Sequence, residues 1–219
     1  MIEEMQVYYD RRAAIYDTSM GYDNPDTVGR LRPVIDNLCH QVRQQQVLEL
    51  ACGPCFWTQF TSQVAHSIVA CDFNISTLAQ AREKDLPWKK VSLCQADAYD
   101  LKNVGGPFGA VMAVDWLAHV PYSRMQTFLE GVHEVLKNDG RVVFCDQLPK
   151  PGPTSGEYDT EGNLIVIRRL PDGSCYRVVK HYMPDEKIRE NFGPYTDHVE
   201  IRRFPDCRRI VVSYQVKTR

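Results

Sequence analysis

The chain alternates short apolar runs with helical patterns from residue 46 onward. Apolar runs of strand length, typical of buried parallel strands, span residues 46–51, 67–72, 91–97, 108–115 and 141–147. The segments between them carry apolar residues at helical spacing, in residues 57–65, 76–84 and 123–138. We expect the last helix to end at residues 138–140, where Gly140 allows a left-handed stop. This alternation predicts an α/β fold with a parallel sheet and helices on both faces.

The two ends of the chain follow other patterns. Residues 3–17 and 25–42 read as two helices, the second opened by Asn24 and Pro25. A Pro/Gly-rich connector after residue 147 leads to a hairpin that turns at Asp172 and Gly173. A short helix at 183–193 and two strands joined by a tight turn at 197–217 close the chain. We see no repeat and no linker, so residues 1–219 are expected to form a single domain.

Composition and charge narrow the class of protein. Of 219 residues, 43% are hydrophobic and 25% are charged, which is ordinary for a globular domain. The net charge of −2 gives no overall positive potential that would attract nucleic acid or an anionic membrane. No apolar run approaches the roughly 20 residues of a membrane helix, and no secretory signal is visible. Three of the eight cysteines (Cys71, Cys94 and Cys145) fall inside predicted strands. We therefore expect a cytoplasmic protein with free thiols.

Residues 52–55, Cys-Gly-Pro-Cys, admit two interpretations. A dithiol oxidoreductase needs a lowered thiol pKa, and thioredoxins carry an aromatic residue where this chain has Ala51. A glycine-rich turn after the first strand would instead bring the backbone close to a nucleotide. That alternative expects an acid about 20 residues later, and Asp72 follows Glu49 by 23 residues. Asp97 ends the third strand in the same way, so the nucleotide interpretation is favoured.

The same segments carry a family resemblance. "VLELACGPCFWT", "VACDFNISTLAQAREK", "CQADAYDL", "FGAVMAVDWLAHVP" and "VLKNDGRVVFCD" resemble the successive motifs of class I S-adenosylmethionine-dependent methyltransferases. "YYDRRAAIYD" and "DWLAHVP" resemble a bacterial small-molecule subgroup. The resemblance implies a Rossmann-like, seven-stranded, mostly parallel sheet with an antiparallel last strand. Cys55 and Ala51 depart from the glycines usual in that loop, and Cys55 would bring a sulfur close to the cofactor.

The resemblance also implies a set of site residues. Those expected to bind S-adenosylmethionine or its product S-adenosylhomocysteine are Tyr9, Arg12, Tyr16, Glu49, Ala51, Gly53, Trp57, Asp72, Phe73, Asp97, Ala98 and Asp115. Asp115 and His119 are the catalytic candidates, although His119 suits a structural role at least as well and Asp115 an ordinary strand-end cap. Asp115 and Asp146 could together bind Mg²⁺, but two carboxylates without a convincing third ligand are weak evidence for such a site. No metal is therefore expected.

The predicted function is in-line methyl transfer from S-adenosylmethionine to a small-molecule acceptor. We expect a helical lid at 1–40, a cofactor-binding core at 46–147, a connector and hairpin at 148–182, and a final helix and antiparallel hairpin at 183–219. No nucleic acid or membrane partner is expected, and a homodimer stays open. The alternatives are an RNA or protein methyltransferase, for which the arginines at 202, 203, 208 and 209 are the basis, and a dithiol oxidoreductase. We interpret those arginines as solvated charges on edge strands.

Overall fold

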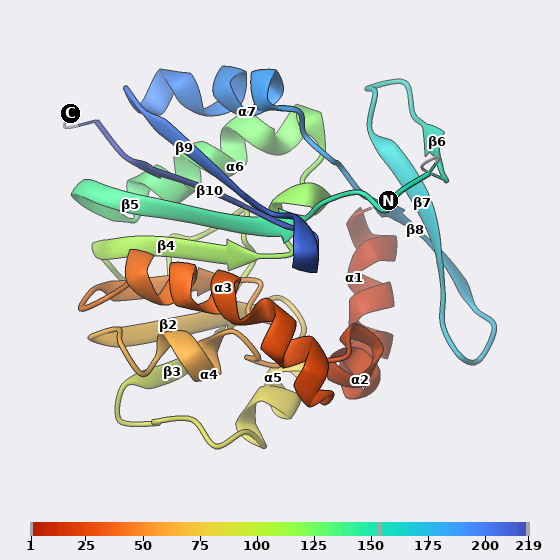
Figure 1. Ribbon diagram of the computed structural model, residues 1–219, viewed down its shortest axis with the longest axis horizontal. Helices are drawn as coiled ribbons and strands as arrows, with labels where there is room; N and C mark the ends of the chain where they lie inside the picture. Colours follow the sequence, from red (N-terminus) through yellow and green to blue (C-terminus); the bar gives the residue numbers. More distant parts are fainter. Residues whose placement is uncertain (1, 153–154, 218–219) are drawn as a thin grey trace.

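A seven-stranded sheet organises the chain, of which the computed structural model describes residues 2–152 and 155–217. Its order is β3-β2-β1-β4-β5-β10-β9 (Figure 1). The strands are β1 (Gln46–Leu50), β2 (Ser67–Asp72), β3 (Val91–Gln95), β4 (Phe108–Val114), β5 (Leu136–Gln147), β9 (Val199–Phe204) and β10 (Arg209–Gln215). Neighbouring strands run parallel except that β10 is antiparallel to both β5 and β9. The predicted fold class is confirmed.

Helices cover both faces of this sheet. The helices are α1 (Ile2–Arg12), α2 (Tyr16–Met20), α3 (Pro25–Gln41), α4 (Thr58–Thr61), α5 (Ile75–Arg82), α6 (Tyr122–Glu134) and α7 (Asp185–Phe192). The 3₁₀ turns are η1 (Ala13–Ile15), η2 (Leu117–His119), η3 (Gly193–Tyr195) and η4 (Pro205–Cys207). The apolar stripes of α6 and α7 pack on one face, and those of α3 and α5 on the other. Asn24 begins α3 as predicted, its side chain accepting from the backbone of Asp26.

A second, smaller sheet stands beyond the carboxyl ends of the main strands. It has the order β6-β7-β8, with β6 (Glu157–Tyr158), β7 (Leu164–Arg169) and β8 (Cys175–Val179). Helix α1 lies between this sheet and the ends of the main strands (Figure 1). Met5 and Tyr8 of α1 pack against Leu164, Val166 and Val178 of the small sheet. The amino-terminal helix is therefore placed at the edge where open α/β sheets bind ligands.

Several local predictions were wrong. Helix α6 ends at Glu134, because Leu136 already pairs with Phe108 of β4, and the left-handed residue is Asp139 (φ 59°) rather than Gly140. Helix α4 keeps only residues 58–61 of the nine predicted at 57–65, and β6 lies in a segment predicted as connector.

In residues 2–152 and 155–217 no helix is both long and apolar enough to cross a membrane.

Candidate functional site

The loop after β1 turns sharply at the carboxyl edge of the sheet. Ala51, Gly53 and Cys55 all have left-handed backbones, with φ of 48°, 56° and 61°. The amide of Gly53 donates to Asp72 Oδ2 at the end of β2, at 3.1 Å. Burial raises the pKa of Asp72, an effect that this bond and one from the Asn74 amide oppose. The acid predicted from spacing therefore holds the loop directly.

The two cysteines of this loop face the protein interior. Cys52 is 6% exposed and Cys55 is fully buried in the core beneath α3. A hydrogen bond with Cys55, together with burial, raises the pKa of the Cys52 thiol. A dithiol oxidoreductase needs the opposite shift. Cys55 also lies outside the walls of the cavity described next, so the expectation that its sulfur approaches the cofactor was wrong.

A cavity of about 80 Å³ runs along the ends of β1, β2, β3 and β4 beneath α1. We call it the cofactor-side cavity. It contains the predicted residues Tyr9, Tyr16, Ala51, Gly53, Asp72, Phe73, Asp97, Ala98 and Asp115. The same wall includes residues that the sequence did not single out, among them Met5, Gln6, Asn74, Tyr99 and Trp116. The signals at the ends of successive strands thus converge on one place.

Three of the predicted cofactor residues lie elsewhere. Glu49 is 1% exposed beneath the loop, and its carboxylate accepts from Thr58 Oγ1 at 2.8 Å. Burial raises the pKa of Glu49 to about 8, and the Thr58 bond opposes this only in part. Trp57 is buried behind the same loop, and Arg12 lines a different cavity.

Tyr9 and His119 form a hydrogen-bonded pair at one end of the cofactor-side cavity. His119 Nδ1 donates to the carbonyl oxygen of Val179 at 2.5 Å, so Nε2 accepts from the Tyr9 hydroxyl at 2.9 Å. Burial, reinforced by the charge of Lys180, lowers the pKa of His119 to about 3. The imidazole is therefore neutral, and its Nε2 lone pair accepts the hydrogen bond from Tyr9.

Asp115 is the centre of a buried polar network. It follows β4 with φ of 58°, and Arg209 Nη1 donates to its Oδ1 at 2.6 Å. Arg209 Nη2 donates to the Tyr22 hydroxyl at 3.0 Å, and Gln147 also donates to Asp115. Burial alone would raise the pKa of Asp115, but the charges of Arg209 and Lys180 lower it below its usual value. The lowered pKa of Asp115 favours its charged form as the partner of Arg209 and makes it a weaker base.

The interpretation of Arg209 as a solvated edge charge was wrong, since it is 4% exposed. Asp146, the other acid considered for Mg²⁺, has no hydrogen bond to Asp115 or Arg209 among those found in the described residues. Its Oδ2 accepts from the Ala118 amide at 3.3 Å, and burial raises its pKa to about 7. Within residues 2–152 and 155–217, no three His, Cys, Asp or Glu side chains gather as a metal-binding group.

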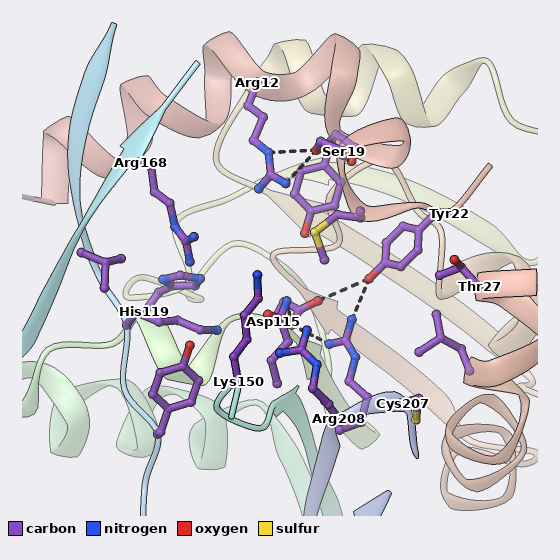
Figure 2. A pocket seen from close by; sticks show the side chains of 18 of the residues that line it. Arg12, Ser19, Tyr22, Thr27, Asp115, His119, Lys150, Arg168, Cys207 and Arg208 are labelled. Atoms are coloured by element: carbon purple, nitrogen blue, oxygen red, sulfur yellow. Dashed lines mark hydrogen bonds and ion pairs between the residues drawn. The ribbon is translucent and has the colours of Figure 1, made fainter. Parts of the chain in front are cut away.

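A larger cavity, of about 570 Å³, adjoins the first. Seven basic side chains line it, so we call it the basic cavity; they are Arg12, Arg30, Lys150, Arg168, Lys180, Arg208 and Arg209. Figure 2 shows Arg12, Lys150, Arg168 and Arg208 converging on it from different sides. The acids in its wall are Asp115 and Asp206. Across the described residues, Arg209 is the member of this set that pairs with a carboxylate. The cavity therefore carries uncompensated positive charge.

Strand alternation could have identified two of these basic residues. Arg168 continues the face of Leu164 and Val166, and Lys180 continues that of Tyr176 and Val178. Because alternate residues of a strand share a face, both charges point the same way as buried apolar side chains. Charge at such positions is a signal for function that the sequence analysis missed.

Comparisons with known proteins agree with this geometry. The family model described as "Methyltransferase domain" matches residues 47–140. A structure of a DhpI–SAH complex is 28% identical, with a TM-score of 0.74, and the match covers 100% of this chain and 98% of that one. A DhpI–SAM–HEP complex is 27% identical, with a TM-score of 0.76 and coverage of 97% and 96%. Residues 47–140 therefore match a methyltransferase domain, and the whole chain is similar to a protein solved in complex with SAH and with SAM.

A more distant structure, DesVI of Streptomyces venezuelae, is 13% identical with a TM-score of 0.66. The match covers 94% of this chain and 98% of that chain, and it supports the fold alone. A search of curated proteins found no match.

The Asp115–Arg209 pair yields a stability prediction. Arg209→Met leaves a buried carboxylate without its partner and should destabilise the protein by about 3–5 kcal/mol. Arg209→Met combined with Asp115→Asn removes both charges and should recover much of that loss. Urea unfolding measures both free energies, with Arg202→Met on the exposed strand edge as control. A double variant no more stable than Arg209→Met would contradict the role given to the pair.

Glu49 yields a pH prediction. Its pKa of about 8 lies above the unfolded value of about 4.3, so the folded protein binds an extra proton between these limits. The free energy of unfolding should therefore fall as pH rises from about 4.3 to 8, by up to about 1.4 kcal/mol per pH unit. Glu49→Gln should lack this fall, whereas Glu83→Gln, at an exposed site, should keep it. Parallel pH profiles for wild type and Glu49→Gln would refute the assignment.

Proposed function

We propose that this protein transfers a methyl group from S-adenosylmethionine to a small acceptor that carries negative charge. The observation behind the proposal is the meeting of two cavities of opposite character. The cofactor-side cavity has Asp72 and Asp97 in its wall, and the basic cavity is dominated by cations. Tyr9, Tyr16, Asp115 and His119 line both cavities. The transferred methyl group would cross where they meet.

The residues of the cofactor-side cavity fit the cofactor. Asp72 would accept from the ribose hydroxyls, and Asp97 would accept from the adenine amino group. The left-handed turn at Gly53 leaves the backbone open to a ligand at this edge. Glu49 lies outside this cavity, and we assign it the support of the loop through its hydrogen bond with Thr58. When bound, S-adenosylmethionine supplies an electrophilic methyl group.

The acceptor side would act mainly by binding and orientation. The unpaired cations of the basic cavity would hold an anionic group, and Tyr9, fixed by His119, would stand at the boundary. Methyl displacement needs the acceptor aligned and water excluded, and α1 and the small sheet enclose the junction. Because His119 is neutral and hydrogen-bonded to Tyr9, we assign it the positioning of Tyr9. The basic residues gather in a cavity rather than along an exposed stripe, which favours a small molecule over RNA.

The test is transfer of labelled methyl from S-adenosylmethionine to a panel of small phosphates and carboxylates, with neutral and cationic analogues alongside. Turnover confined to anionic acceptors is the expected result. Turnover of neutral or cationic analogues at equal rates would refute the anionic class. Turnover of RNA, with affinity falling steeply as salt rises, would favour the nucleic-acid alternative.

Arg168 offers a matched pair of variants. Its side chain reaches the basic cavity, while Arg169 on the opposite face of β7 is exposed. Arg168→Gln should weaken acceptor binding about ten- to a hundredfold, the loss of a charged hydrogen bond of about 1.5–3 kcal/mol. Arg169→Gln should leave it unchanged. Acceptor KM and calorimetric Kd measure the effect, and equal losses in both variants would indicate general electrostatics instead of a contact.

Helix α1 is proposed as a lid. It covers the small cofactor-side cavity and is fastened by the Arg177 amide to Glu4 at 2.7 Å and by Ser76 to Asp10 at 2.6 Å. We expect it to open for ligand exchange and to close over the bound cofactor. Hydrogen exchange of the amides of residues 5–12 should therefore slow on adding S-adenosylhomocysteine. Unchanged exchange would show α1 to be fixed scaffolding.

A further inference from the structure

A third cavity, of about 300 Å³, lies beside the basic cavity on the α7 side of the sheet. Its wall is mainly apolar, and we call it the apolar cavity. Residues that form it include Leu117, Leu148, Met183, Ile188, Ile210 and Val212. Met183 and Leu148 are partly exposed, so apolar surface faces solvent here. Arg203 in the wall is paired with Asp185.

The partition between the two cavities is thin. In η2, Ala118 faces the apolar cavity and the next residue, His119, faces the basic cavity. After β8, Lys180 faces the basic cavity and the next residue, His181, faces the apolar one. In both segments, neighbouring residues therefore line different cavities, so a single layer of chain separates the basic cavity from the apolar cavity.

Two side chains line both cavities at once. Gln147, at the carboxyl end of β5, and Tyr182, after β8, are each in contact with the basic cavity and with the apolar cavity. The two cavities therefore meet at these side chains. Gln147 also donates to Asp115, which lines the cofactor-side cavity. The apolar cavity is consequently one residue removed from the junction where methyl transfer is placed.

We propose that the apolar cavity is a second subsite of the acceptor, and that the acceptor is an amphiphilic anion whose apolar tail lies there. This inference rests on the proposed function. The charges determine how the acceptor is oriented. Its anionic group is attracted to the unpaired cations of the basic cavity, and its apolar tail is removed from water by packing against Met183 and Leu148. The reverse orientation would place an anion near Asp146 and expose the tail to the arginines of the basic cavity.

Monoalkyl phosphates from methyl to hexyl test the tail subsite by calorimetry. Each added methylene should tighten binding by up to about fourfold until the cavity is filled. Met183→Trp should fill the cavity and abolish this gain while leaving the affinity for methyl phosphate intact, and Met183→Leu should keep the gain. Leu148→Trp gives a second obstruction from another part of the wall, and retained methyl phosphate binding reports a folded protein.

The outcomes separate the two proposals. Binding of methyl phosphate without any gain for longer chains would overturn the tail subsite and leave the anionic acceptor standing. A gain that persists in both tryptophan variants would place the tail elsewhere and also overturn the subsite. No binding of any phosphate, methyl phosphate included, would overturn the anionic acceptor and the subsite with it.

Discussion

The buried ion pair between Asp115 and Arg209 connects the parts of the molecule from which the site is built. Asp115 follows β4, and Arg209 opens β10, which runs antiparallel to its neighbours in the seven-stranded sheet. The same guanidinium donates to Tyr22, which stacks on Phe56 at 3.7 Å, and lies over the ring of Trp57. Through these contacts the ion pair connects β10, the turn between α2 and α3, and the loop after β1. A buried charge without its partner is strongly unfavourable, so these segments are held to one arrangement.

This arrangement also sorts charge across the site. Carboxylates line the cofactor-side cavity and the unpaired cations line the basic cavity, with Tyr9 and His119 between them. A sulfonium is itself a cation, and nearby unpaired basic groups would repel it in an interior of low dielectric. An anionic acceptor removes that repulsion by pairing with those groups. The chemistry of the donor and the charge of the acceptor cavity are therefore compatible when both ligands are present.

The parts of this structure that follow from short-range pattern were predictable. The apolar runs, and the residues that separate them, predicted the main strands. The acids at the ends of two of these strands, Asp72 and Asp97, line the same cavity. The burial of Arg209 was not predicted, because charged residues on edge strands are usually exposed to solvent. Its partner Asp115 is 94 residues away in the chain, so no local pattern indicated the pair. The apolar cavity was invisible for the same reason, since its walls come from η2, β5, β10 and α7. Alternation along β7 and β8 did contain a usable signal for Arg168 and Lys180.

The cofactor loop shows how tertiary contacts override a local preference. A left-handed backbone costs a residue with a Cβ roughly 1–2 kcal/mol relative to the ordinary helical region, and both Ala51 and Cys55 adopt it. The Cys52 amide donates to the Cys71 carbonyl at 2.9 Å, and Gly53 donates to Asp72. Full burial of the Cys55 side chain adds apolar contact that a glycine could not supply. The sulfur that departs from the family pattern therefore contributes to the core, and the loop keeps the backbone shape that glycines usually provide.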